Sequence, residues 1–360
     1  MADSKPIHIA LLLPSLKFGG AERVAVNLIK AFSELGLQVD MLLMSHQGEF
    51  LEEASEYCRV VDLCCDRTYK LPGKLLRYFY TQRPDVLLSS FWKLNLCVCL
   101  ARMFYWGVRL LLWEHSPPSK SKNSPRWLYM ITASLCYQMA YKVVTVSNGV
   151  YADVARWSIG LKRKLIVIFN PINPPSQQLL DKVQPKKDQQ IVWVGRLDSR
   201  KNPMLALEAF ALLPKDSGYR FIFVGDGPLR SSLELRCKEL NLLGRVTFLG
   251  YQAKPYEVMA VSDLLVLSSP SEGLPSVLVE ALFCGIRIVA TDCGEGIHDI
   301  LLENRYGIIV PADNAVCLAA AIEDALKKPF DKGVQMKGAQ RFLPEIIARQ
   351  FLTVMDFKTK

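Results

Sequence analysis

Short hydrophobic runs alternate with longer amphipathic segments along the whole chain. The runs cover residues 7–13, 39–44, 86–89, 109–113, 142–146, 165–168, 191–194, 220–224, 245–248, 264–267, 287–290 and 308–310. Because they lack the polar alternation of a half-exposed strand, they predict strands covered on both faces, as in parallel sheets. Segments between them, such as 203–213 and 228–240, have helical periodicity. The pattern predicts an α/β protein with two Rossmann-like, doubly wound units in tandem.

A polar stretch that contains Pro174 and Pro175 interrupts this alternation near the middle of the chain. Such a stretch favours a break between folded segments. The expected parts are an N-terminal domain of residues 1–172, a linker of residues 173–188 and a C-terminal domain of residues 189–340. The last segment, residues 341–360, has apolar positions at helical spacing and no strand after it. It predicts a helix that packs back toward the N-terminal domain.

The first predicted strand is followed by Gly19 and Gly20 at the start of a predicted helix. Paired glycines permit a sharp turn and let a ligand approach backbone N–H groups at the positive helix end. A plain turn is the alternative explanation. The Gly-x-Gly-x-x-Gly fingerprint of dinucleotide-binding proteins is absent, and Asp40 falls inside the second predicted strand. Both features oppose a dehydrogenase, which is the alternative enzyme class for this pattern.

Two cations, Arg196 and Lys201, lie in the loop that follows the first strand of the second half. A guanidinium fork and an ammonium group five residues apart suit the binding of a diphosphate at the start of the next helix. A solvated basic loop is the alternative, and we expect Arg200 to be solvated. The later Gly-Asp-Gly-Pro sequence, residues 225–228, predicts a turn before a helix.

Two carboxylates, Glu272 and Glu280, mark the segment with the most specific pattern. Glu272 lies in a Gly/Pro loop after a predicted strand, and Glu280 falls about two helical turns later, within an otherwise apolar helix. A carboxylate buried there without a partner costs several kcal/mol. We therefore expect Glu280 to face a cation or a ligand such as the hydroxyls of a ribose, with an exposed helix position as the alternative.

Taken together, four sequence elements resemble glycosyltransferase family 4. They are Gly-Gly-Ala-Glu-Arg (19–23), Gly-Arg-x-x-x-x-Lys-Asn-Pro (195–203), Gly-Asp-Gly-Pro (225–228) and Glu-Gly-Leu-Pro-x-x-x-x-Glu-Ala (272–281). They occur in order over almost the whole chain. The resemblance implies the GT-B fold, in which two Rossmann-like domains face a central cleft. It also implies a retaining, metal-independent transfer from a nucleotide sugar, without a cofactor.

The resemblance also implies roles for residues of the C-terminal domain. Arg196 and Lys201 would neutralise the donor diphosphate, Glu280 would accept the ribose hydroxyls and Glu272 would lie beside the transferred sugar. The motif residues Leu274 and Pro275 would contact the nucleotide. Cations at the leaving group replace a metal ion in this chemistry, and the chain has no Asp-x-Asp pair. Since no second carboxylate is an obvious nucleophile for the far face of the sugar, the resemblance implies that retention proceeds by front-side attack.

In the N-terminal domain the resemblance implies that Gly19 and Gly20 bring backbone N–H groups to the phosphate. A residue at the end of a strand would complete the site, and His115 is the first candidate. Glu114 is the alternative.

The amino-acid composition narrows the possible classes of protein. Half of the 360 residues are hydrophobic and 22% are charged, which excludes a disordered, collagen-like or coiled-coil protein. The ten cysteines form no Cys-x-x-Cys pair and only four histidines are present. We expect reduced thiols, no zinc site and a cytoplasmic location. The apolar stretch 127–141 is shorter than a membrane span.

The net charge of +9 is divided unevenly. Residues 1–170 carry 21 Lys and Arg against 13 Asp and Glu, whereas residues 171–360 carry 23 against 22. The cations of the first half are mixed with aromatic residues, which favours peripheral docking on an anionic membrane and a lipid-linked glycan acceptor. A solvated basic face with a soluble acceptor is the alternative. A non-enzymatic nucleotide-binding scaffold is a further alternative, and no nucleic-acid-binding module accompanies the charge.

Overall fold

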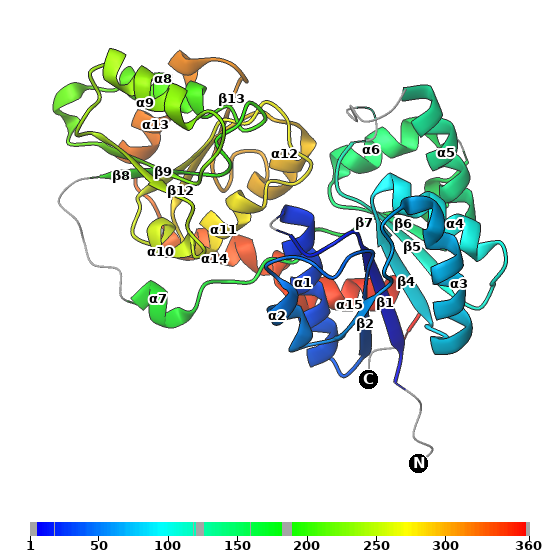
Figure 1. Cartoon of the computed structure of the whole chain (residues 1–360). Coiled ribbons are helices and arrows are strands. Elements are labelled where there is room, and N and C mark those ends of the chain that lie inside the picture. The colour runs from blue at the N-terminus through cyan, green and yellow to red at the C-terminus, as the bar shows by residue number, and fades with distance from the viewer. Residues whose placement is uncertain are drawn as a thin grey trace. The chain divides into compact units, whose positions relative to one another are not determined.

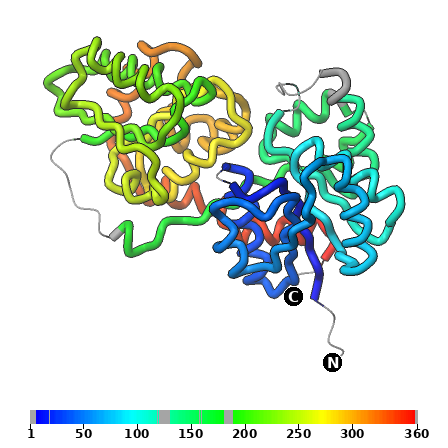
Figure 2. Tube along the Cα trace, viewed as in Figure 1, coloured from blue at the N-terminus to red at the C-terminus, as the bar shows by residue number. Residues whose placement is uncertain are grey.

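The computed structural model describes residues 6–17, 19–117, 119, 126–158, 160–181 and 189–357 (Figure 2). The chain divides into two compact units. Unit 1 comprises Met1–Asn173 with Phe342–Lys360, and unit 2 comprises Pro174–Arg341. Residues 182–188, within the expected linker, lie outside the described residues.

Unit 1 contains a seven-stranded sheet in which every neighbouring pair is parallel (Figure 1). In the order β3-β2-β1-β4-β5-β6-β7, the strands are β3 (Arg59–Asp62), β2 (Gln38–Leu43), β1 (His8–Leu13), β4 (Val86–Ser90), β5 (Arg109–Glu114), β6 (Lys142–Thr145) and β7 (Leu165–Val167). The helices are α1 (Gly20–Glu34), α2 (Leu51–Ser55), α3 (Leu71–Gln82), α4 (Trp92–Arg102), α5 (Arg126–Met139), α6 (Asn148–Trp157) and α15 (Pro344–Val354).

The C-terminal helix α15 is part of unit 1. It packs against α1, where the rings of Phe32 and Phe351 lie 6.1 Å apart. Phe351 also contacts Trp113 of β5 with a centroid distance of 5.4 Å. Ile347, Ala348 and Phe351 are fully buried, so the apolar spacing of the tail is explained by a helix that completes the core of unit 1.

Unit 2 contains a six-stranded parallel sheet. In the order β10-β9-β8-β11-β12-β13, the strands are β10 (Val246–Gly250), β9 (Arg220–Val224), β8 (Gln190–Val194), β11 (Leu264–Leu267), β12 (Arg287–Thr291) and β13 (Ile308–Val310). The helices are α7 (Gln177–Asp181), α8 (Pro203–Ala211), α9 (Arg230–Glu239), α10 (Tyr256–Met259), α11 (Ser276–Cys284), α12 (Glu295–Leu301), α13 (Ala315–Lys327) and α14 (Lys332–Ala339).

These sheets confirm the predicted fold class, and each of the twelve predicted strands is present within two residues of its expected ends. The sequence pattern missed β3. This edge strand has only Val60 and Val61 between Arg59 and Asp62, and neither end of it is buried, so it lacks the hydrophobic run that marks a covered strand.

The strand order reverses once in each unit, between β1 and β4 and between β8 and β11. Loops at the carboxyl ends of the two strands diverge at such a switch point, and ligands of doubly wound proteins bind in the crevice between them. The sites are therefore expected after β1 and β4 in unit 1 and after β8 and β11 in unit 2.

A buried polar cluster joins the first strands of unit 1 to α3. Asp40 on β2 is fully buried and lies 3.0 Å from Nε2 of His8. The Tyr78 hydroxyl donates to Asp40 at 2.5 Å, and Arg59 forms an ion pair with the same carboxylate. Burial acts to raise the pKa of Asp40, but hydrogen bonds from His8, Arg59 and Tyr78 outweigh it and lower the pKa to about 2. Asp40 is thus a structural residue.

Candidate active site

The loop after β8 is organised by Asp198. Its Oδ1 accepts the backbone N–H groups of Arg200 at 3.0 Å and Lys201 at 3.3 Å, and its Oδ2 lies 2.7 Å from the Arg200 guanidinium. Burial raises the pKa of Asp198, but the bonds from Arg200 and Lys201 outweigh it and lower the pKa. Asn202 follows with a left-handed φ of 45° and precedes α8. The turn therefore sets where the Lys201 side chain begins.

Lys201 and Glu272 meet at the switch point of unit 2. Lys201 Nζ lies 2.5 Å from Glu272 Oε1, and the two side chains are 30% and 16% exposed. One residue follows β8 and the other follows β11, so the ion pair bridges the two loops that diverge there. Two of the predicted site residues are thus brought together where a ligand of this fold binds.

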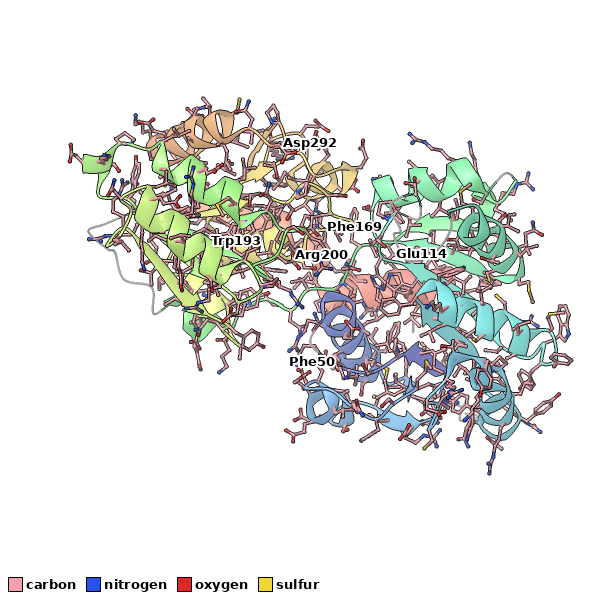
Figure 3. All side chains as sticks on the ribbon, turned by 45° about the horizontal axis from the view of Figure 1, so that its top comes forward. Phe50, Glu114, Phe169, Trp193, Arg200 and Asp292 are labelled. Atoms are coloured by element: carbon pink, nitrogen blue, oxygen red, sulfur yellow. The ribbon has the colours of Figure 1, made fainter. Side chains whose placement is uncertain are left out.

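A buried serine at the end of β11 also connects the same two loops. Ser268, directly after β11, accepts the indole N–H of Trp193 at 3.0 Å. The Ser268 Oγ also lies 2.8 Å from the carbonyl oxygen of Asn202. Trp193 lies inside unit 2 (Figure 3) and is 1% exposed. These bonds fix the Lys201 loop to the end of β11.

Close backbone approaches explain the Gly-Asp-Gly-Pro turn. Gly225 has φ +132°, and a Cβ there would lie 1.9 Å from the Gly195 carbonyl oxygen. A Cβ on Gly227 would lie 2.5 Å from the Leu197 carbonyl oxygen. Glycine is required at both positions because the Arg196 loop passes directly over them. The turn therefore holds the Arg196 loop in place. The sequence predicted this segment as a structural turn.

Sequence reasoning missed the loop after β12. A Cβ on Gly296 would lie 2.0 Å from the carbonyl oxygen of Gly273, and the Glu272 N–H donates to the Cys293 carbonyl at 3.0 Å. The loop with Gly294 and Gly296 therefore supports Glu272 from the side. The available signal was the Gly-Glu-Gly sequence after a hydrophobic strand, residues 294–296.

The other predicted residues of unit 2 occupy different positions. Arg196 is exposed, and its Nε lies 3.7 Å from Asp198 Oδ2. Arg200 is also exposed, although it pairs with Asp198 rather than being solvated alone. Glu280 lies partly exposed on α11 between fully buried neighbours, and Leu274 and Pro275 are buried just before that helix.

In unit 1 the neighbours Glu114 and His115 point in different directions. The Glu114 carboxylate is buried (Figure 3) and accepts bonds from Tyr137 at 3.1 Å and Asn95 at 3.3 Å. Burial raises the pKa of Glu114 to about 7, although the two hydrogen bonds oppose this shift. The side chain is held between α4 and α5, which carry Asn95 and Tyr137.

His115 remains partly accessible at the carboxyl end of β5. Its Nε2 lies 3.3 Å from Ser90 Oγ at the end of β4, and its ring packs on Trp113 with a centroid distance of 4.6 Å. Burial lowers the pKa of His115 to about 4. The imidazole is therefore neutral near pH 7 and can act as a hydrogen-bond donor or acceptor there.

Phe91 is a further candidate residue, and the sequence carries no signal for it. It directly follows β4 with φ 74° and ψ 126°, a combination that L-residues rarely adopt, and its ring faces His115 at 6.5 Å. Strained residues of this kind cluster at functional sites. Phe91 and His115 thus mark the same end of the sheet, beside the switch point.

The glycine pair begins α1. Gly19 has an extended backbone, but an added Cβ would lie 2.1 Å from Oε2 of Glu22, whose side chain folds back over it. Burial raises the pKa of Glu22. At Gly20 an added Cβ would meet nothing within 4 Å. Gly20 therefore leaves open space at the start of the helix.

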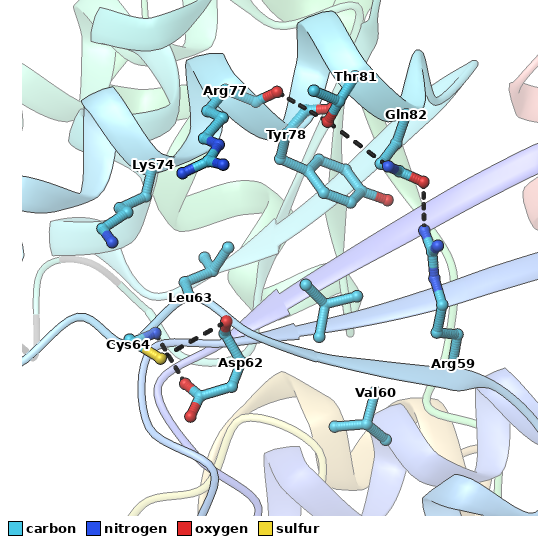
Figure 4. A pocket seen from close by; sticks show the side chains of 11 residues that line it. Arg59, Val60, Asp62, Leu63, Cys64, Lys74, Arg77, Tyr78, Thr81 and Gln82 are labelled. Carbon is cyan, nitrogen blue, oxygen red and sulfur yellow. Dashed lines mark hydrogen bonds between the residues drawn. The ribbon is translucent and has the colours of Figure 1, made fainter.

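A separate hollow of about 360 Å³ lies between β3 and α3 in unit 1 (Figure 4). It is lined by Arg59, Lys74 and Arg77 together with Asp62, Val60 and Leu63. This hollow runs along the edge strand β3 and is distinct from the loops at the switch point. Within the described ranges, no group of three or more His, Cys, Asp or Glu side chains is arranged to hold a metal ion.

Two doubly wound parallel units, with a cation and a carboxylate paired at a switch point, define a GT-B protein. A family model described as Glycosyltransferase Family 4 matches residues 18–175, and one described as Glycosyl transferases group 1 matches residues 177–341. The chain therefore belongs to the family-4 glycosyltransferases, as the sequence motifs predicted, and it is an enzyme of the hexosyltransferase type.

Known relatives span nearly the whole chain. A Campylobacter jejuni protein named N-acetylgalactosamine-N,N'-diacetylbacillosaminyl-diphospho-undecaprenol 4-alpha-N-acetylgalactosaminyltransferase is 30% identical over 96% of this chain and 98% of its own length. Another from the same organism, named an alpha-1,4-N-acetyl-D-galactosaminyltransferase of a PP-undecaprenol glycan, is 27% identical over 93% of each chain. The crystal structure of Anabaena HepE with UDP superposes with a TM-score of 0.82 at 21% identity, covering 96% of this chain and 99% of that one. This last likeness shows the fold.

Proposed function

We propose that the chain is a retaining, metal-independent enzyme that transfers a hexose or N-acetylhexosamine from a UDP-sugar to a lipid-linked glycan. The product would be a cell-surface polysaccharide or glycoconjugate. The observation that carries the proposal is the Lys201–Glu272 pair between the β8 and β11 loops. It puts a cation and a carboxylate at the position where doubly wound units bind nucleotides.

Lys201 and Arg196 are proposed to bind the diphosphate of the donor. The reaction breaks a sugar–phosphate bond and releases a nucleoside diphosphate, so preorganised cations lower the barrier by stabilising the developing charge. Lys201 forms an ion pair with Glu272. A bound diphosphate competes for the ammonium group and frees Glu272 to contact the sugar.

Other residues are proposed to orient the substrates. Glu280 accepts the ribose hydroxyls, Leu274 and Pro275 contact the nucleotide, and Gly19 and Gly20 offer N–H groups to the phosphate. His115 acts as a neutral hydrogen-bonding group for the sugar or the acceptor hydroxyl, since its pKa is lowered to about 4.

The names of the relatives support the acceptor and the stereochemistry. Both Campylobacter jejuni proteins are named for glycans on diphospho-undecaprenol and for alpha linkages. UDP-hexosamine donors also carry the sugar in the α configuration, so an alpha product corresponds to retention. HepE was crystallised with UDP, which supports a UDP-linked donor here.

The charge division supports docking of unit 1 on the cytoplasmic face of a membrane, where a lipid-linked acceptor is presented. No helix within the described ranges has the length and hydrophobicity of a membrane span, so attachment would be peripheral. Lys120 and Lys122, which contribute to the basic charge, lie outside the described residues.

A panel of nucleotide sugars tests the donor assignment by thermal shift and by hydrolysis. A bound donor at a hundred times its Kd should stabilise the chain by about 2.7 kcal/mol. Glu280→Gln should weaken UDP binding, whereas Glu272→Gln should mainly lower kcat. Activity should persist in excess chelator, and NMR of the product should show an alpha linkage. Loss of activity with chelator, or a beta product, would contradict the proposal.

A further inference from the structure

Four exposed large hydrophobic side chains of unit 1, Tyr80, Met103, Phe104 and Trp106, gather at one end of its helical layer. Helices α3, α4 and α5 pack side by side, and each leads from the carboxyl end of one parallel strand to the amino end of the next. Their last turns therefore gather at the amino ends of the strands. The loop between α4 and β5 lies at that end and contains Met103, Phe104 and Trp106, which are 55%, 68% and 77% exposed.

This loop is held in place by a half-buried tyrosine. Tyr105 packs on Phe79 and on Tyr80 with centroid distances of 5.5 and 5.1 Å. The Tyr80 hydroxyl donates to the Phe104 carbonyl at 3.1 Å, while the Tyr80 side chain stays 60% exposed. Phe104 and Trp106, on either side of Tyr105, are thus held outward in a fixed loop.

The surroundings of the loop are strongly basic. Residues 71–109 contain six Lys and Arg and a single acidic residue, Asp85, whose carboxylate accepts the His8 N–H at 2.8 Å. The Arg102 guanidinium lies 4.6 Å from the centre of the Trp106 ring. Aromatic residues with neighbouring cations match the boundary between anionic headgroups and acyl chains.

The hollow between β3 and α3 extends this basic surface. Arg77 is three residues from both Lys74 and Tyr80 along α3 and therefore neighbours each of them on the helix surface. Lys74 and Tyr80 themselves are about 120° apart around the helix. Figure 4 shows Lys74 and Arg77 projecting from α3 at the hollow. Cations that border a hollow beside exposed aromatic residues suit the phosphate of a lipid headgroup.

Unit 2 carries no comparable aromatic group in its described part. Its exposed large hydrophobic residues are Leu212, Leu235, Leu243, Leu249, Tyr251, Leu302, Val316 and Val334. They contain a single aromatic residue and are distributed over several elements. Scattered exposed side chains of this kind are normal for soluble surfaces, so the group in unit 1 calls for a specific explanation.

We propose that Phe104 and Trp106, with Tyr80, insert into the headgroup boundary of an anionic bilayer while Lys74 and Arg77 bind its phosphates. This inference rests on the peripheral docking in the proposed function and names the element that performs it. The anchor lies at the amino end of β5, whereas His115 lies at the carboxyl end of the same strand. About 20 Å of strand separates them, so the reacting end of the acceptor is held away from the lipid.

Co-sedimentation with vesicles tests the anchor. The wild type is compared with Phe104→Ser/Trp106→Ser and with Lys74→Gln/Arg77→Gln, on phosphatidylcholine vesicles with and without phosphatidylglycerol. The first variant should bind anionic vesicles about tenfold more weakly at every salt concentration, since it loses two inserted aromatic groups. The second should lose the preference for phosphatidylglycerol. Leu212→Ser/Leu243→Ser, which removes exposed leucines from unit 2, should bind like the wild type.

Three outcomes overturn the proposal. They are equal vesicle binding by the wild type and the aromatic variant, equal weakening by the unit 2 control, and self-association of the wild type in solution that the aromatic variant loses while its vesicle binding is unchanged. Thermal unfolding verifies that the variants are folded. Transfer to a water-soluble acceptor analogue should be unchanged in the aromatic variant. A wild type that binds vesicles but transfers no sugar would contradict the proposed function and leave the anchor intact.

Discussion

The two units share a topology but differ in which of their loops contact one another through glycine backbones. In unit 2 the loops contact one another through glycine backbones, as Gly225 does with Gly195 and Gly296 with Gly273. In unit 1 the loops after β4 and β5 are held by side chains, through Ser90, Trp113 and His115. Backbone contacts permit only glycine, whereas side-chain contacts can be made by several residue types. The loops after β4 and β5 therefore carry no glycine motif, whereas the glycine contact of unit 1 lies between the loops after β1 and β2, where a Cβ on Gly48 (φ +132°) would lie 1.9 Å from the Leu16 carbonyl carbon.

The largest expected effect breaks the backbone contacts of unit 2. Gly225→Ala would put a Cβ 1.9 Å from the Gly195 carbonyl oxygen at a φ of +132°. We expect a loss of about 4 kcal/mol in the free energy of unfolding, because losses this large arise from steric overlap or backbone strain of this kind. Urea unfolding followed by circular dichroism measures it. A loss below 1 kcal/mol would show that the two loops can separate without cost.

The next effect concerns catalysis in the same unit. Lys201→Ala should cost about 2 to 4 kcal/mol of transition-state stabilisation, because it removes a charge opposite the leaving diphosphate. Arg196→Ala should act in the same direction. Arg200→Ala is the matched control, since it removes a cation from the same loop that is directed to Asp198. Steady-state kcat/KM with a saturating acceptor separates them, and equal effects of Lys201 and Arg200 would contradict the diphosphate assignment.

In unit 1 the corresponding structural element is the Asp40 cluster. Asp40→Asn should destabilise the chain by about 3 kcal/mol near pH 7, since it leaves buried donors without a carboxylate. The pKa of Asp40 is lowered to about 2, below its unfolded value of about 3.9. Its stabilisation is thus complete above the unfolded value and is lost as the pH falls through about 2. The difference between wild type and variant, measured by urea unfolding at pH 7 and pH 3, should shrink in acid.

Glu114 tests which residue of unit 1 faces the reaction. Its pKa is raised to about 7, so the buried carboxyl stabilises the fold in acid and loses that contribution as the pH rises through about 7. Glu114→Gln should therefore be more stable than the wild type at pH 8, by about 2 kcal/mol, and should lose this advantage at pH 5. It should also retain turnover.

His115→Ala is the partner experiment. It should lower kcat about a hundredfold with little change in UDP affinity, as expected for a group that orients reacting atoms. If Glu114→Gln is inactive and His115→Ala is not, the assignment of the two neighbours is reversed. Stopped-time assays at pH 7, together with UDP titration by calorimetry, distinguish these cases.

The sequence predicted the sheets because covered strands require uninterrupted hydrophobic runs, and β3 escaped because it is a partly exposed edge. Lys201 and Glu272 could be selected as residues that follow strands, but their 2.5 Å contact depends on which strands are neighbours. The φ of 74° at Phe91 has no sequence signature. The large apolar side chain of Trp106 favours burial. Its 77% exposure follows from the tertiary position of its loop.

The smallest expected effect concerns Gly20 in unit 1, in contrast to Gly225 in unit 2. An added Cβ at Gly20 meets nothing within 4 Å, and the residue is the first of α1. Gly20→Ala should therefore stabilise the fold by about 0.5 to 1 kcal/mol, because it restricts the unfolded chain without strain. If the start of α1 receives the donor phosphate, the added methyl group should nevertheless weaken UDP binding. Thermal unfolding with and without UDP measures both effects in one experiment. A variant that is more stable and binds UDP like the wild type would remove Gly20 from the donor site.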